Sequence, residues 1–483
     1  MDFIRYFKIK KLLRQSRFIE ACAIDQYSQY INLSWVYYRL GMYKASLDAP
    51  YHTLDFYTLF SKTISASYLG KREAVLKYIL LLKKKYPNKL SNLVLPLATY
   101  YPECAMELLL FIQDKKSPIF FALHAHIYGK KLTLEKYGIT LRQKNVDNEN
   151  FTFLFSNITI SEHSQKIDQF NKILSNYNLR NIFLKTSSST FKVSNLQSEN
   201  QLIEGEEFPL VSILVPAFNV EGRIQSCVDS LINQDYPNIE IIIVDDASTD
   251  STVQVIQQLS EKYTQVKAIY LPVNVGPFVA KNVAITIANG EFVTTQDADD
   301  WAHPQRIINQ IQPLLYHPDL VATTCNWVRL DDSGDFYAKQ FIPFIRFNPS
   351  SPLFRKSKIL EQTGCWHSVR MAADTEFIER LKLVFGKDKI FAVKQPLVVG
   401  AHRTNSLMTS EITGNFENKI SNTRLDYWEA WRFWHIQQLR LSLIPRMSDL
   451  LNDSELFDVP VSMKNSIENM EVIQKFIKNG YSL

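Results

Sequence analysis

The stretch that decides the fold reads Val211-Ser212-Ile213-Leu214-Val215-Pro216-Ala217-Phe218-Asn219. Its run of apolar and β-branched residues, closed by a proline and polar residues, predicts a buried strand. Four further apolar runs follow, at 239–244, 266–271, 291–295 and 320–327. Segments of helical periodicity separate these runs, at 223–233, 252–263, 277–288 and 304–315. This alternation predicts an α/β domain built on a doubly wound, mostly parallel sheet.

Polar residues follow these strands, at the place where ligands of such sheets bind. Asp245 and Asp246 end the second strand, and Asp297-Ala298-Asp299 follows the fourth. So many carboxylates at one edge of a sheet repel one another unless a cation or a hydrogen-bonding ligand is present. The spacing of Asp297 and Asp299 suits Mg²⁺ or Mn²⁺, with a diphosphate and water completing the coordination. An isolated Asp-x-Asp triplet is more often an ordinary turn, so its position after a strand carries the prediction.

Together these motifs resemble the family-two glycosyltransferases of the GT-A fold. The resemblance rests on four segments in the family's order, namely 211–219, 243–248, 274–276 and 294–301. It covers roughly Pro209 to His402. It implies an inverting, metal-dependent transfer of a sugar from a nucleotide-diphosphate sugar to a glycan or a lipid-linked acceptor. Helical attachments are familiar in members that build bacterial surface or capsular polysaccharides.

The resemblance also implies roles for single residues of the donor site. Pro216 and Phe218 are both expected to bind the donor nucleotide, and Phe218, which stands where the family often has Tyr, would pack on the nucleobase. Asp246 would accept a hydrogen bond from the base or ribose, with Asp245 the second choice. Lys281 stands where the family frequently has Arg and would touch the base or a phosphate.

For the metal and the sugar, the resemblance assigns Asp297 to the ribose or sugar and Asp299 to the metal. His402, which follows a strand-like segment at 397–400, could be a third metal ligand, although a lone histidine is as often structural. Mn²⁺ or Mg²⁺ is therefore the expected cofactor.

A general base must take the proton of the acceptor hydroxyl as it attacks the anomeric carbon. The segment Arg370 to Phe377 looks like the family's acidic motif at the start of a helix, with Ala373 in place of the usual Glu. Asp374 is therefore the expected base and Glu376 the alternative. Asp374 could instead, or in addition, cap the helix. Variable loops around 325–329, 351–355 and 366–370 are candidates for the acceptor pocket.

The first 200 residues differ from the rest in charge. They hold 28 Lys and Arg against 15 Asp and Glu, a net charge of +13, whereas the remaining 283 residues carry −8. Their periodicity is helical, and Leu-Gly-x-x-x-Ala occurs at 40–45 and 69–74. This pattern suggests either a degenerate tetratricopeptide-like repeat or an irregular helical bundle.

We divide the chain accordingly into a helical N-terminal domain (1–142), a connector (143–207), a GT-A domain (208–408) and a helical C-terminal extension (409–483). The basic residues of 8–17, interleaved with apolar ones, favour contact with an anionic membrane. RNA binding or a merely solvated helix face are the alternatives, and nucleic acid is the less expected partner.

The composition sets further limits. The chain has 483 residues, 46% of them hydrophobic, and its five scattered cysteines argue against a disulfide framework or a zinc site. The longest uncharged stretch is about 13 residues, too short to span a bilayer, and no secretory signal is expected. These features fit a cytoplasmic protein, with peripheral contact on the inner face of the membrane. The alternative to an enzyme is a scaffold that binds nucleotide sugars without turnover.

Overall fold

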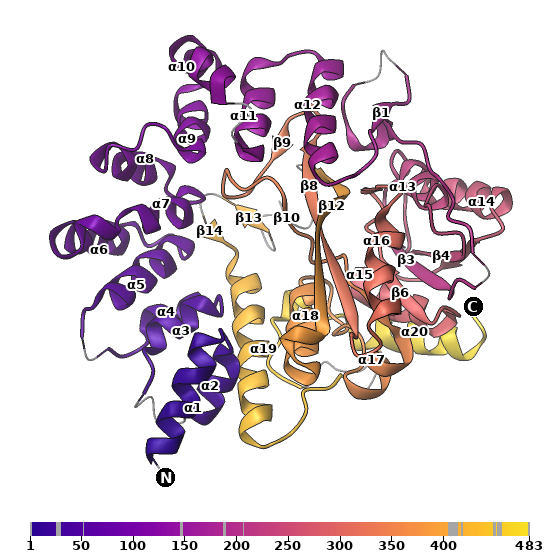
Figure 1. Cartoon of the computed structure of the whole chain (residues 1–483). Helices are drawn as coiled ribbons and strands as arrows, with labels where there is room; N and C mark the ends of the chain where they lie inside the picture. Colours follow the sequence, from indigo (N-terminus) through magenta and orange to yellow (C-terminus); the bar gives the residue numbers. More distant parts are fainter. Residues whose placement is uncertain are drawn as a thin grey trace.

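The computed structural model describes residues 2–25, 30–51, 53–144, 148–186, 190–205, 207–403, 414–416, 419–447, 451 and 456–481. Within them, a helical N-terminal region lies along one side of a region built on a large sheet (Figure 1). The predicted α/β domain with helices before and after it is therefore confirmed.

The N-terminal region is an array of helices that pack on their sequence neighbours. They are α1 (Asp2–Arg14), α2 (Phe18–Ile24), α3 (Leu33–Arg39), α4 (Tyr43–Asp48), α5 (Phe56–Tyr68), α6 (Arg72–Lys85), α7 (Ser91–Ala98), α8 (Pro102–Phe111), α9 (Pro118–Tyr128), α10 (Lys130–Lys144), α11 (Glu149–Thr159) and α12 (His163–Asn176). Gly41 and Gly70 turn the chain after α3 and α5 with φ of 71° and 70°, which favours glycine. The turns between helices that the repeat hypothesis expects at these two glycines are thus present. The helical region continues to Asn176, well into the segment expected to be a connector.

Small hydroxyl residues let α3, α4 and α5 pack closely. Ser34 Oγ lies 2.9 Å from Ser61 Oγ and donates to the Ser46 carbonyl at 2.9 Å, while Ser65 Oγ bonds Ser46 Oγ at 2.9 Å. All four serines are buried. Because each hydroxyl has a partner, this polar contact is compatible with burial.

The large sheet contains ten strands among the described residues. They are β3 (Val211–Ala217), β4 (Ile239–Asp245), β5 (Val266–Tyr270), β6 (Phe292–Thr295), β7 (Trp301–Ala302), β8 (Ala322–Asp331), β9 (Phe336–Tyr337), β10 (Arg346–Phe347), β11 (Leu353–Arg355) and β12 (Ile390–His402). Their order is β5-β4-β3-β6-β11-β8-β12-β7, with β9 and β10 paired to β8. Two-stranded ribbons form from β1 (Phe183–Leu184) with β2 (Leu196–Gln197) and from β13 (Asn415–Phe416) with β14 (Lys419–Ile420).

The sheet is mixed, with the expected parallel pairing along its longer strands and antiparallel pairing at its short ones. β5, β4, β3 and β6 run parallel, as does β12 beside β8. The short strand β11 is antiparallel to both β6 and β8, and β7, β9 and β10 also pair antiparallel. Strands of two or three residues have no readable periodicity, so the sequence did not reveal these reversals.

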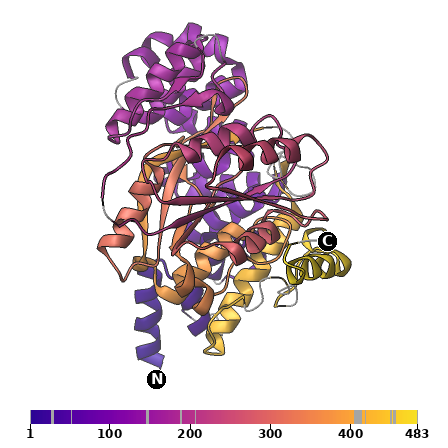
Figure 2. The same cartoon turned by 90° about the vertical axis from the view of Figure 1, so that its right-hand side faces the viewer.

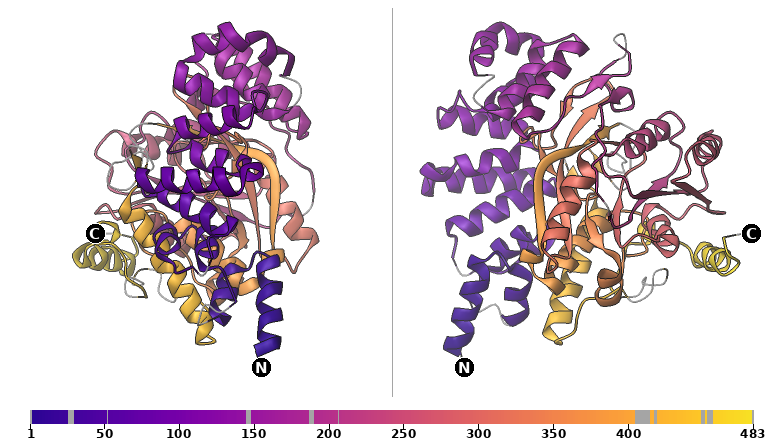
Figure 3. Two further views of the ribbon diagram at one scale, coloured as in Figure 1. Left: turned by 90° about the vertical axis from the view of Figure 1, so that its left-hand side faces the viewer. Right: turned by 45° about the vertical axis from the view of Figure 1, so that its right-hand side comes forward.

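Helices cover the sheet and extend beyond it. They are α13 (Ile224–Ile232), α14 (Thr252–Lys262), α15 (Pro277–Ile287), α16 (Arg306–Tyr316), α17 (Lys356–Gln362), α18 (Ala373–Phe385), α19 (Asn422–Arg440) and α20 (Ile467–Lys478). In Figure 2, α20 lies beside the C-terminus at the edge of the molecule, and α1 projects from the end that carries the N-terminus. Figure 3 shows the N-terminal helices stacked along one side of the sheet region, opposite the C-terminus.

The N-terminal region and the sheet share a hydrophobic core. The rings of Phe153 and Phe336 lie 4.7 Å apart, and Asn157 Nδ2 donates to the Phe336 carbonyl at 2.8 Å. At a second contact between the two regions, α19 packs against α2 and α4. Glu429 of α19 accepts from the backbone N–H of Lys44 at 2.6 Å. Helix α19 therefore joins the N-terminal helices to the sheet region.

Candidate active site

The first part of the candidate site is the edge where parallel strands β3, β4 and β6 end. The backbone N–H of Asp246 donates to the Ala217 carbonyl at 2.8 Å, which holds the ends of β3 and β4 together. Phe218, directly after β3, is 45% exposed, so its ring is available to pack on a ligand. Pro216 precedes it within the strand.

Asp246 and Asp245 are both buried but differ in their contacts. Asp246 accepts from the N–H groups of Val275 and Gly276, each at 2.7 Å, and from Asn274 Nδ2 at 2.9 Å. Burial raises the pKa of Asp246 to about 6, although these hydrogen bonds oppose the shift. Asp245 Oδ2 accepts from the Ser248 N–H at 3.0 Å, while its buried Oδ1 has no hydrogen-bond partner. The open acceptor atom at this strand end therefore belongs to Asp245, and Asp246 holds the loop after β5.

Lys281 connects two of the predicted carboxylates. Its side chain is 1% exposed, and its Nζ lies 3.2 Å from Asp374 Oδ1 and 4.0 Å from Asp297 Oδ1. Asp297 follows β6, whereas Asp374 lies in the first turn of α18, so the lysine joins the strand ends to that helix. Asp297 also accepts from Ser350 Oγ at 3.1 Å.

Asp374 and Glu376 lie two residues apart and have opposite environments. Burial raises the pKa of Asp374, and the Asp297 charge adds to this, while Lys281 and Arg424 lower it. A carboxylate with a raised pKa beside a partly exposed site can serve as a general base. Glu376 is 0% exposed and bonds Arg380 at 2.8 and 2.9 Å and His435 Nε2 at 3.0 Å. Burial alone would raise its pKa, but these partners lower it to about 2. The two carboxyls therefore differ, since Asp374 has a raised pKa beside Lys281 and Glu376 is held in a buried ion pair.

Asp299 faces a cationic partner. Its Oδ2 lies 2.8 Å from Arg403 Nε. Burial raises the pKa of Asp299, Arg403 opposes the rise, and the Asp297 charge adds to it. Asp300 accepts from the Ala401 N–H at 2.9 Å, which ties this loop to the end of β12.

The side chains that could act as metal ligands suit a hard cation only in part. Asp297 and Asp299 are close enough to repel each other, a situation that a divalent cation relieves. His402 at the end of β12 stacks on Tyr337 with ring centroids 3.5 Å apart, and burial lowers its pKa to about 4. Within the described ranges, no group of three or more His, Cys, Asp or Glu residues is placed to hold a metal. The two aspartates therefore fit a cation that takes its other ligands from a donor diphosphate and water.

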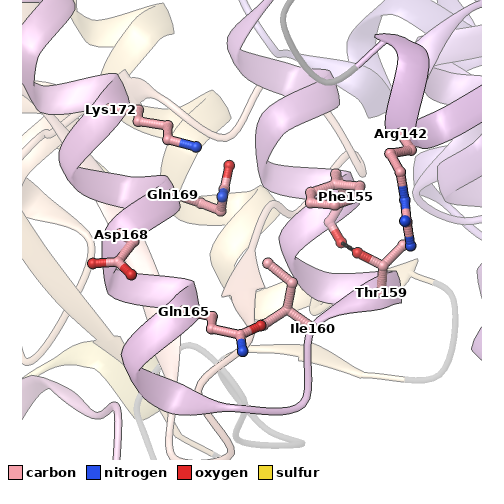
Figure 4. A pocket seen from close by; sticks show the side chains of 8 residues that line it. All are labelled: Arg142, Phe155, Thr159, Ile160, Gln165, Asp168, Gln169 and Lys172. Atoms are coloured by element: carbon pink, nitrogen blue, oxygen red, sulfur yellow. Dashed lines mark hydrogen bonds between the residues drawn. The ribbon is translucent and has the colours of Figure 1, made fainter.

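One hollow of the molecule contains none of these residues. Figure 4 shows it between α11 and α12, lined by Phe155, Gln169 and Lys172 among others, with Arg142 of α10 at its side. Its residues belong to the N-terminal region and include none of the strand-end carboxylates. All five cysteines are free and buried.

The sequence did not predict the contributions of Arg424 and Ser350. Arg424, on α19, is buried and close enough to Asp374 to lower the pKa of that carboxyl. Neither residue lies in a motif, and each reaches the site from an element distant in sequence, so no local signal could have identified them.

Comparison with known proteins finds similarity in the sheet region. Residues 212–377 match the family model described as glycosyl transferase family 2. An uncharacterized glycosyltransferase of Haemophilus influenzae is 35% identical over 127 residues, which are 26% of this chain and 50% of the relative. The poly(ribitol-phosphate) beta-glucosyltransferase of Bacillus spizizenii is 42% identical over 101 residues, which are 20% of this chain and 16% of the relative. The chain thus spans half or less of the length of these two relatives.

Among solved structures, S. aureus TarS 1–349 in complex with UDP-GlcNAc has a TM-score of 0.37 and 19% identity. The similarity covers 51% of this chain and 70% of TarS 1–349.

Proposed function

We propose that this chain, which carries a family 2 glycosyltransferase domain at residues 212–377, transfers a sugar from a nucleotide-diphosphate sugar to a hydroxyl of a glycan or lipid-linked acceptor. We place the reaction in the synthesis of a surface polysaccharide. The observation that carries the proposal is the convergence of Asp297 and Asp374 on the buried Lys281, at the carboxyl end of β6.

In this proposal Asp374 takes the proton of the acceptor hydroxyl while the hydroxyl oxygen attacks the anomeric carbon. The bond from that carbon to the diphosphate breaks on the opposite face, so the configuration inverts and the diphosphate leaves with the electron pair. Lys281 holds Asp374 in place, and its charge keeps the carboxylate ionised between turnovers. Phe218 packs on the nucleobase, and the free Oδ1 of Asp245 accepts from the base or ribose.

Asp297 and Asp299 are the residues that would hold Mn²⁺ or Mg²⁺. Such an ion would stabilise the negative charge of the departing diphosphate. Arg403 faces the same carboxylate and offsets its charge.

A panel of nucleotide sugars, each incubated with the purified protein and Mn²⁺ or Mg²⁺, tests the proposed function. We expect release of the nucleoside diphosphate from at least one donor, and loss of that release in Asp374→Asn. Calorimetry on the same panel separates the alternative scaffold, because a scaffold would bind a nucleotide sugar and release nothing. Binding of no nucleotide sugar at all would contradict both functions.

We also propose that α1 attaches the protein to an anionic membrane, where lipid-linked acceptors are found. Ile4 is 76% exposed and Phe7 is 53% exposed, and basic residues accompany them on the same helix, at Lys8, Lys10, Lys11 and Arg14. Among the described residues, no helix combines the length and the apolarity needed to span a bilayer. Attachment would therefore occur at the surface, through apolar side chains and charge.

Vesicle co-sedimentation tests this attachment. Replacing Ile4 and Phe7 by Ser should reduce binding to anionic vesicles, and salt should weaken the binding of the unchanged protein. Leu441 and Ile444 are similarly exposed and give a matched control when replaced by Ser. An equal loss of vesicle binding in both variants, or binding that does not depend on salt, would contradict the role of α1.

A further inference from the structure

Four cationic side chains gather where the N-terminal region meets the second half of the sheet. This cationic cluster consists of Arg329 on β8, Lys339 between β9 and β10, Arg346 on β10 and Arg424 on α19. Arg329 Cζ lies 5.5 Å from the ring of Tyr337, its cross-strand partner on β9. Lys339 Nζ lies 5.8 Å from the ring of Tyr100, which joins α7 to α8 in the N-terminal region.

Two of these guanidinium groups retain hydrogen-bonding capacity. Arg329 is 8% exposed, and its Nη2 donates to the Ala401 carbonyl at 2.7 Å. The Nε atoms of Arg329 and Arg346 are buried and have no hydrogen-bond partner. Across the described ranges, neither arginine forms an ion pair with a carboxylate. A buried donor without an acceptor is unfavourable, so the cluster is suited to a ligand that supplies acceptor oxygens.

The charges of the cluster act on one another. Burial, with the charges of Arg424 and Arg346 adding to its effect, lowers the pKa of Lys339 to about 7. Burial likewise lowers the pKa of Arg346, with Arg329 adding to the effect. Like charges held together in a partly buried place destabilise the protein unless an anion offsets them. The arrangement therefore favours an anionic ligand rather than a neutral one.

The position of the cluster points to the acceptor rather than the donor. The strand ends that form the donor site belong to β3, β4 and β6, whereas β8 and its partners lie beyond β11 in the same sheet. Arg424 lies near Asp374, the proposed base, so the cluster borders the site where the acceptor hydroxyl must sit. Residues 325–329 are also one of the segments expected from the sequence to shape the acceptor pocket.

We propose that Arg329, Lys339, Arg346 and Arg424 bind a phosphate group carried by the acceptor, and so select phosphate-bearing acceptors over neutral glycans. The inference rests on the proposed function, because it assigns the substrate class of the same site. A phosphate group is matched to this cluster since arginine forks bind its oxygens in pairs and lysine acts as a point charge. The phosphate could belong to a lipid diphosphate or to a phosphodiester within a glycan chain.

Calorimetry with inorganic phosphate tests the cluster on the full-length protein, with the donor site filled by a nucleoside diphosphate and Mg²⁺. We expect Arg346→Gln and Lys339→Met each to weaken phosphate binding by at least about tenfold, the effect of losing one charge-assisted hydrogen bond. Lys262→Met is the matched control, because Lys262 also lies over a tyrosine ring, that of Tyr263, but outside the cluster. Arg346→Lys should retain part of the affinity because it keeps the charge.

Binding that is equal in all variants, or absent from the unchanged protein, would overturn the inference. A polyprenyl diphosphate in micelles and a soluble glycerol-phosphate oligomer then serve as competitors, and the one that displaces phosphate identifies the source. Displacement by neither would also overturn it. Donor hydrolysis, measured in parallel, reports on the proposed function independently, since it requires no acceptor. If donor hydrolysis persists but phosphate binding is equal in all the variants, only the acceptor assignment is rejected.

Discussion

The two halves of the large sheet carry opposite charges around their sites. In the donor half, carboxylates gather at the ends of β4 and β6, and burial raises the pKa of both Asp246 and Asp299. Beside the half formed by β8, β10 and β12, buried and half-buried cations gather instead, and burial lowers the pKa of Lys339 and of Arg424 on α19. The two halves thus differ in sign, which is the basis of the proposal that one binds a cation-bound diphosphate and the other an anion. Asp374 and Lys281 lie where the halves meet.

The largest expected effect comes from removing the proposed base at this junction. Asp374→Asn keeps the size of the side chain and its contact with Lys281 but cannot accept the proton of the acceptor hydroxyl. We expect the transfer rate to fall by about 10² to 10⁴-fold, with donor affinity changed little. Steady-state kinetics together with donor calorimetry would check both parts. A rate within threefold of the unchanged protein would remove Asp374 from this role.

Glu376 offers the matching experiment on the same helix. Its ion pair with Arg380 is fully buried, so Glu376→Ala leaves an unpaired charge and should lower the free energy of unfolding by about 3–5 kcal/mol. Chemical denaturation would measure the loss. The protein that remains folded should retain transfer, which would separate this residue from Asp374.

The pH dependence of stability sharpens the assignment of Glu376. Its pKa is lowered to about 2 in the folded protein, below the ordinary value of 4.5. The stabilisation is therefore complete above about pH 4.5 and is lost as the pH falls toward 2. Glu376→Gln should lose less stability than the unchanged protein over this window. If the free energy of unfolding fell equally with pH in the two proteins, the assignment would be contradicted.

A smaller effect, on metal activation, is expected from changing Asp299 in the half of the sheet that carries the carboxylates. Replacing it by Asn removes one of two carboxylates that repel each other, so we expect weaker metal activation rather than loss of folding. The Mn²⁺ concentration for half-maximal activity should rise about tenfold or more, because a charged ligand is lost. Activity that needs no divalent cation in either protein would show that these aspartates bind no metal.

The two halves also differed in how far the sequence revealed them. Asp246, Asp297 and Asp299 each follow a strand, so a local pattern and the rule for parallel sheets place them at one edge. Arg424 and Tyr100 come close to the same region from segments separated by more than three hundred residues. No periodicity records such contacts, since they depend on how α19 and the N-terminal helices pack. The reversal of β11 was hidden for a related reason, because three residues are too few to show a direction.

The contacts within a motif were equally hard to predict. Asp245 and Asp246 are chemically identical neighbours, and only the fold decides which of them binds the loop at 274–276. The same holds for Asp374 and Glu376, which lie two residues apart on α18. Because a helix turns by 100° per residue, they face different surroundings, one toward Lys281 and the other toward Arg380 and His435.

The smallest expected effect lies in the basic half and concerns Lys339. Its folded pKa is about 7, below the ordinary 10.5, because of burial and the neighbouring Arg424 and Arg346. The unfolded chain then binds more protons than the folded protein between about pH 7 and 10.5, so stability contributed by this group increases as the pH rises through that window. Lys339→Met should remove the increase, whereas Lys262→Met should leave it in place. Since inorganic phosphate would favour the protonated lysine, it should flatten the same curve in the unchanged protein, and a curve that phosphate leaves untouched would mean that no anion sits beside Lys339.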